Sequence, residues 1–103
     1  MAGITTHVLD TAHGRPAAGV RLTLTRGDAV LFEGVTDADG RARILAPERV
    51  EPATYRLTFD TGAYNPNGFF PEATIVFRID DVAQHYHVPL LLSPFGYATY
   101  RGS

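Results

Sequence analysis

The sequence predicts an all-β protein in which two antiparallel sheets pack as a sandwich. Apolar and polar residues alternate with a period of two over many short stretches, as in strands that bury one face. Glycine, proline and aspartate separate these stretches at intervals typical of sandwich turns. The chain has 103 residues, the usual size of one domain, so we expect residues 1–103 to form a single domain.

About eight strands follow from the alternation. The pattern is clearest where Val20, Leu22 and Leu24 alternate with polar neighbours, and it recurs with Tyr55 and Ile75 at the start of similar runs. Shorter runs of the same character complete the set. In chain order, the predicted strands span residues 4–9, 20–25, 29–35, 41–45, 54–59, 74–79, 86–92 and 97–100.

The segments between these runs carry turn residues. Residues 13–16 read as a loop, and residues 37–40 as a turn whose glycine can adopt a positive φ. Residues 93–96 turn the chain between the last two strands. Residues 61–71 contain too many glycines and prolines for a strand, and we expect one short helix there at most.

Composition excludes several classes of function. The chain has no cysteine and a net charge of −2, so it forms no disulfide and has no electrostatic attraction to nucleic acid or an anionic membrane. The apolar runs are too short to cross a bilayer. An alternating strand follows Met1-Ala2-Gly3 directly, which leaves no room for a secretion signal. We therefore expect a cytoplasmic protein without nucleic-acid or membrane partners.

Two of the four histidines lie on one predicted strand. His85 and His87 are two residues apart, so a regular strand points both to the same face. The opposite face carries Tyr86, Val88 and Leu90, which read as core. The histidine-bearing face is therefore the outer one.

Two further strands present basic groups in the same manner. His7 shares a face with Thr5, opposite Val8, and Arg41 shares a face with Arg43. Three strands thus project imidazole or guanidinium groups from their surfaces, which indicates a candidate polar site.

The last four residues, Tyr100-Arg101-Gly102-Ser103, follow an aromatic-rich strand directly. Most chain ends are frayed and carry no function. A glycine and two polar residues in this place suggest an end that takes part in chemistry. Ser103 next to a histidine could act as a nucleophile, although no glycine-flanked nucleophile elbow supports this.

The residues alone leave other interpretations open. Histidines and arginines on strands are commonly solvated surface residues without a further task, and His13 reads as a surface residue of its loop. His-x-His with a third histidine could also bind zinc, but no carboxylate at suitable spacing completes the set. A structural module that binds partners by strand addition is a further alternative.

Five stretches together resemble the transthyretin-like 5-hydroxyisourate hydrolases, and the match covers nearly the whole chain. The opening strand and loop, and the last two strands with the terminal tetrapeptide, carry the most specific signatures. The stretches are residues 6–11 followed by 14–17, then 36–41, 69–72, 85–93 and 100–103.

The resemblance implies a transthyretin-like sandwich of eight strands with one short helix, assembled as a homotetramer that is a dimer of dimers. Its active sites would lie at the dimer–dimer interface and need no cofactor and no metal. The reaction would be hydrolysis of 5-hydroxyisourate, a product of urate oxidation, to 2-oxo-4-hydroxy-4-carboxy-5-ureidoimidazoline. The carrier transthyretin shares the fold but lacks these histidines, the arginine and the Tyr-Arg-Gly-Ser end, so carriage without turnover is the alternative function.

The resemblance also implies roles for individual residues. We expect His7 and His87 to form a hydrogen-bonded pair that activates water, with His85 in support. Arg41 would orient the planar substrate and stabilise developing negative charge. The predicted catalytic residues are His7, Arg41, His87 and Ser103, and the predicted substrate-binding residues are His7, Arg41, Tyr100, Arg101, Gly102 and Ser103.

Overall fold

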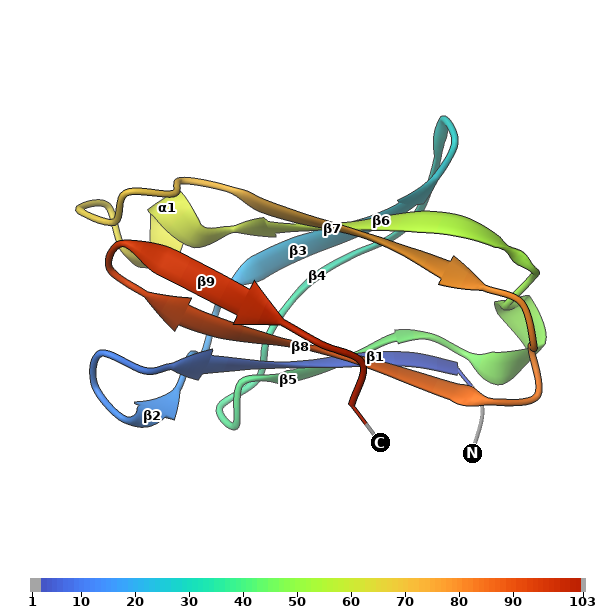
Figure 1. Cartoon of the computed structure of the whole chain (residues 1–103), viewed down its shortest axis with the longest axis horizontal. Coiled ribbons are helices and arrows are strands. Elements are labelled where there is room, and N and C mark those ends of the chain that lie inside the picture. Colours follow the sequence, from blue (N-terminus) through green and yellow to red (C-terminus); the bar gives the residue numbers. More distant parts are fainter. Residues whose placement is uncertain (1–2, 103) are drawn as a thin grey trace.

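The alternating stretches pair into two β-sheets that face each other across a common core (Figure 1). The structure is a computed structural model and describes residues 3–102. The first sheet has the strand order β2-β1-β8-β9, with β5 paired to β1, and the second has the order β4-β3-β6-β7. The strands of the first sheet are β1 (Gly3–Asp10), β2 (Arg15–Pro16), β5 (Arg41–Leu45), β8 (His85–Ser93) and β9 (Gly96–Thr99). Those of the second are β3 (Arg21–Arg26), β4 (Ala29–Val35), β6 (Ala53–Asp60) and β7 (Ala73–Ile79).

Two short helical segments complete the described chain. A single 3₁₀ turn, η1 (Pro47–Arg49), follows β5, and the helix α1 (Thr61–Tyr64) follows β6. Asp60 caps α1 by accepting a hydrogen bond from the Ala63 amide. Within residues 3–102, no helix is long and apolar enough to cross a membrane.

The core lies between the inner faces of the two sheets. The alternation of each strand sends every second side chain inward, where burial of apolar surface stabilises the fold by roughly 25 cal/mol per Å². The largest fully buried apolar side chains are Ile4, Val8, Val20, Leu22, Leu24, Tyr55, Leu57, Phe59, Ile79 and Leu90. The faces predicted for β1 and β8 are confirmed, because Val8, Val88 and Leu90 are buried while His7 and His87 lie on the outer side.

The structure confirms the eight predicted strands and the short helix within residues 61–71. The exception is the segment 13–16, expected to be a loop throughout. Its last two residues form β2, which pairs with Leu9 and Asp10 of β1. Gly14 has φ +65°, which lets the chain reverse tightly enough for this pairing.

One strand pair differs from the antiparallel arrangement predicted. β1 and β8 run parallel, and in their register Thr5 lies beside His87 and His7 lies beside Pro89. The alternation of residues determines which face a side chain occupies, but it does not determine the neighbouring strand or its direction. This pairing joins the two ends of the chain and places their histidines on one surface.

The turn before β5 fixes the position of Arg41. Gly40 has φ +76°, and a Cβ there would collide with the Val8 carbonyl oxygen. The Asp37 carboxylate accepts hydrogen bonds from the amides of Asp39 and Arg41, both at 2.9 Å. Arg41 therefore begins β5 directly opposite His7 of β1.

Candidate functional site

Three adjacent strands bring the predicted basic residues onto the outer face of the first sheet. In the β1–β5 pair, His7 lies opposite Arg41 and Thr5 lies opposite Arg43. On the other side of β1, Thr5 lies beside His87 of β8. Directly paired residues have Cβ atoms roughly 4.5–5.5 Å apart, so strand register alone places these side chains in one patch.

This patch contains an open groove of about 420 Å³. Two arginines and two histidines line it, together with Thr5 and an aspartate. Its lining includes Thr5, Asp37, Arg41, Arg43, His85 and His87. The groove is therefore strongly basic, and its groups can hold a flat molecule rich in carbonyl oxygens.

His87 is half-buried in the groove. Its Nδ1 lies 2.8 Å from Oγ1 of Thr5. Burial lowers the pKa of His87 below 6.5, and the positive charges of His85, Arg41 and His7 lower it further. The ring is therefore neutral at pH 7, and its Nε2 is the nitrogen left to exchange a proton.

His7 makes a different contact. Its Nε2 lies 2.9 Å from the carbonyl oxygen of Asp39, and a carbonyl oxygen can only accept. The Nε2 of His7 therefore carries a proton and donates it to Asp39. Within one chain, the described rings of His7 and His87 bond Asp39 and Thr5 and not each other, and their pairing stays a prediction.

The segment after β9 returns to the groove. The Gly102 amide donates a hydrogen bond to the His87 carbonyl oxygen at 2.8 Å. A Cβ at position 102 would lie 2.5 Å from Cδ2 of the His87 ring, which is inside van der Waals contact. Glycine is thus required here for close approach to His87.

Arg101 anchors this segment to the end of β8. Its guanidinium donates to the Gln84 side-chain oxygen at 2.7 Å and lies 4.4 Å from the centre of the Tyr86 ring. Arg101 and Tyr100 line another hollow, between β7 and β8, and not the histidine groove. Their predicted substrate-binding role stays a prediction, and Ser103 lies outside the described residues.

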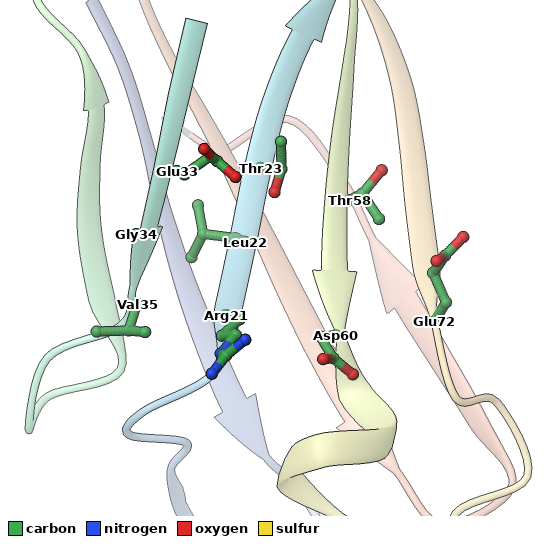
Figure 2. Close-up of a pocket in the computed structure, with 9 residues that line it drawn as sticks. All are labelled: Arg21, Leu22, Thr23, Glu33, Gly34, Val35, Thr58, Asp60 and Glu72. Atoms are coloured by element: carbon green, nitrogen blue, oxygen red, sulfur yellow. The ribbon is translucent and has the colours of Figure 1, made fainter. Parts of the chain in front are cut away.

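A larger hollow of about 600 Å³ lies on the second sheet and is shown in Figure 2. Arg21 is accompanied there by three carboxylates, those of Glu33, Asp60 and Glu72. The hollow contains no histidine and none of the predicted site residues. We therefore place the candidate site in the smaller groove, where groups that titrate near neutral pH meet arginines.

Sequence reasoning missed the role of Thr5. It placed Thr5 on the face of His7 but gave it no function, because the contact with His87 depends on the parallel pairing of β1 and β8. The zinc alternative finds no support in the described range 3–102, where no three His, Cys, Asp or Glu side chains gather closely enough to hold a metal ion.

Comparison with known proteins agrees with this geometry. The model of the HIUase/Transthyretin family matches residues 4–102. The chain belongs to the HIUase/Transthyretin family. The match includes β1, β5, β8 and the residues after β9, so the whole groove lies within the family region.

Individual members of the HIUase/Transthyretin family show how close the similarity is. The chain is 46% identical to a 5-hydroxyisourate hydrolase of Caulobacter vibrioides over all of both chains. It is also 46% identical to a mouse 5-hydroxyisourate hydrolase, with 97% of this chain and 94% of that protein covered.

Solved structures agree on the fold. The 5-hydroxyisourate hydrolase of Klebsiella pneumoniae superposes with a TM-score of 0.91 at 37% identity over all of both chains. Transthyretin from Sparus aurata has the same TM-score at 31% identity, covering 99% of this chain and 97% of that one. The backbone therefore matches enzyme and carrier equally well, and the side chains of the groove must separate the two functions.

Proposed function

We propose that this chain is an enzyme that hydrolyses 5-hydroxyisourate to 2-oxo-4-hydroxy-4-carboxy-5-ureidoimidazoline. The observation that carries the proposal is the meeting of His7, Arg41 and His87 on one outer sheet face, through the registers of β1 with β5 and β8. Relatives 46% identical over nearly their full length are named as hydrolases of this compound. A carrier needs no group that titrates near pH 7 in its binding surface.

In the proposed reaction, water attacks a carbonyl carbon of the substrate ring and the adjacent C–N bond breaks. Nε2 of His87 takes a proton from the water and later returns one to the departing nitrogen, so no proton is gained or lost by the enzyme. A well-placed general base of this kind accelerates a reaction by about 10²–10⁴. The lowered pKa of His87 keeps its ring neutral and ready to accept that proton.

Arg41 and His7 bind and polarise the substrate in this scheme. The planar guanidinium of Arg41 donates to carbonyl oxygens and stabilises the oxyanion that forms during attack. Because Nε2 of His7 donates a hydrogen bond to the Asp39 carbonyl oxygen, Nδ1 of His7 is the atom that contacts the substrate. The contact with Asp39 also ties His7 to the turn that positions Arg41.

The terminal residues complete the proposed site. Gly102 allows the segment after β9 to pack on His87, and Arg101 fixes that segment to Gln84. Ser103 is assigned a hydroxyl contact to the substrate as the fourth catalytic residue. Substrate binding by Tyr100 and Arg101 belongs to the same proposal, although in one chain these residues line the hollow between β7 and β8.

We also propose that the site is completed by assembly. The groove lies on an open sheet face, and a sandwich of this size cannot hollow out a deep pocket without losing core. A homotetramer, formed as a dimer of dimers with these faces opposed, would cover the groove. Sedimentation at assay concentrations should give a tetramer, and a fully active monomer would contradict this assembly. A cytoplasmic location, without nucleic-acid or membrane partners, belongs to the same proposal.

The test of function generates 5-hydroxyisourate from urate in the cuvette and follows its ultraviolet decay. The chain should accelerate the decay above the spontaneous rate, and His87→Ala should reduce kcat by about 10²–10⁴. His13→Ala is the matched control, because His13 lies on the loop after β1 and contacts Asp10 instead of the groove. Binding without acceleration would favour a carrier.

A further inference from the structure

A single hydroxyl group links two histidines of the groove. Oγ1 of Thr5 lies 2.9 Å from Nε2 of His85 and 2.8 Å from Nδ1 of His87. The two ring centres are 6.2 Å apart, so the rings meet through the hydroxyl and not directly. Thr5 occupies this place because it pairs with His87 in the parallel register of β1 and β8. The pair before it on the same face of the sheet is Gly3 with His85.

The number of protons restricts how these three groups can bond. A hydroxyl has one proton to donate, and a neutral imidazole has one nitrogen that donates and one that accepts. Thr5 can therefore donate to at most one of the two rings, so at least one ring must donate to Thr5. The tautomers of His85 and His87 are consequently linked through Oγ1.

We infer that Thr5 is a positioning residue that holds the proton of neutral His87 on Nδ1, by accepting from Nδ1 and donating its own proton to Nε2 of His85. This arrangement leaves Nε2 of His87 unprotonated, which is the form that can take a proton from water. The choice of this arrangement over its reverse rests on the proposed function, whereas the link between the two rings through Oγ1 rests on the distances alone. The reverse arrangement would place the proton on Nε2 and leave His87 unable to act as a base.

The charged and titratable groups around His87 do not make this choice. His85 lies on the same strand, Arg41 and Arg43 project from β5, His7 projects from β1, and Asp37 comes from the turn before β5. Their charges change how readily the ring gains a second proton. A directional hydrogen bond to one nitrogen favours one position of the first proton, and in this groove Thr5 makes such a bond to Nδ1.

Three variants test the inference. Thr5→Val keeps the branched shape of the side chain and removes the hydroxyl, and Thr5→Ser keeps the hydroxyl. Thr58→Val is the matched control, because Thr58 Oγ1 bonds Thr74 Oγ1 on the second sheet, away from the histidines. Thermal unfolding of each variant establishes that it folds.

The first readout is the ¹⁵N NMR spectrum of the imidazole nitrogens at a pH where His87 is neutral. Wild type, Thr5→Ser and Thr58→Val should show His87 protonated at Nδ1, and Thr5→Val should shift the population toward Nε2. A wild-type ring protonated mainly at Nε2, or an unchanged tautomer in Thr5→Val, would overturn the inference. This measurement decides the question even if 5-hydroxyisourate is not the substrate.

The second readout is the steady-state rate with 5-hydroxyisourate. Because the base acts in the transition state, Thr5→Val should lower kcat by about 10–100-fold while KM changes by less than about threefold. Thr5→Ser should restore most of kcat, and Thr58→Val should leave both parameters near wild type. A loss confined to KM, or no rescue by serine, would show that Thr5 acts only in packing. An inactive wild type with the expected NMR tautomer would refute the proposed function and leave the assignment of Thr5 intact.

Discussion

Replacing Gly102 by alanine tests whether the segment after β9 supports His87. The added Cβ would lie 2.5 Å from Cδ2 of His87 and 3.2 Å from Cγ. Carbon atoms in favourable contact are about 3.5 Å apart or more, so the ring or the segment must move by about 1 Å. The His87 ring is hydrogen-bonded to Thr5, and the Gly102 amide is hydrogen-bonded to the His87 carbonyl oxygen. Movement of the ring would disturb the first hydrogen bond, and movement of the segment would disturb the second.

The expected effect of Gly102→Ala is mainly on catalysis. A displacement of about 1 Å at a reacting group can cost about 100-fold in rate, and we expect a loss of kcat of that order. The cost in stability should be near the lower end of overpacking effects, about 1 kcal/mol, because position 102 is only half-buried. The ultraviolet decay of 5-hydroxyisourate gives the rate, and urea unfolding gives the free energy of unfolding.

Gly96→Ala provides the control for this measurement. Gly96 begins β9, and a Cβ there would meet Oγ of Ser93 at 3.7 Å, which is ordinary contact. This variant should keep both its rate and its stability. If Gly102→Ala also retained wild-type kcat, the packing of this segment on His87 would have no part in the reaction.

Three further predictions concern charge and hydrogen bonding. Burial and the neighbouring positive charges lower the pKa of His87, so the acid limb of the pH profile of kcat/KM should have its midpoint below pH 6.5. A midpoint above that pH would contradict the role of His87 as the base. Arg41→Lys replaces the bidentate guanidinium donor by an ammonium group and removes one hydrogen bond to the oxyanion of the transition state. The loss of this bond, about 1.5 kcal/mol, should lower kcat/KM about tenfold in the same ultraviolet assay. Tyr64→Phe removes the hydrogen bond of 2.7 Å to the buried Asp10 carboxylate and should reduce the free energy of unfolding in urea by about 1.5–3 kcal/mol at pH 7. Burial alone would raise the pKa of Asp10, but hydrogen bonds from Tyr64 and His13 lower it on balance below 3.8. The stability that the ionised Asp10 contributes is therefore present above pH 3.8 and is lost as the pH falls through the folded-state pKa. If Tyr64→Phe reduced the free energy of unfolding equally at low and neutral pH, the assignment would be refuted.

The sequence by itself determined the strands and their faces. Alternation with a period of two is a local property of each stretch, so it could be read for β8, where Val88 faces the core and His87 faces outward. Turn chemistry is local as well, and Asp37 and Gly40 form the expected turn before β5. The resemblance of five stretches to one family then indicated which outward residues to group together.

Only the tertiary structure decided which side chains meet. The parallel pairing of β1 with β8 places Thr5 beside His87, and no pattern within either strand specifies that partner or its direction. His7 bonds Asp39 of the turn before β5, and the return of the chain after β9 places Gly102 against the His87 ring. Contacts between residues more than eighty positions apart in sequence, such as that of Thr5 with His87, depend on the packing of whole sheets. For this reason the chemistry of single residues was predictable, and their hydrogen-bond partners were not.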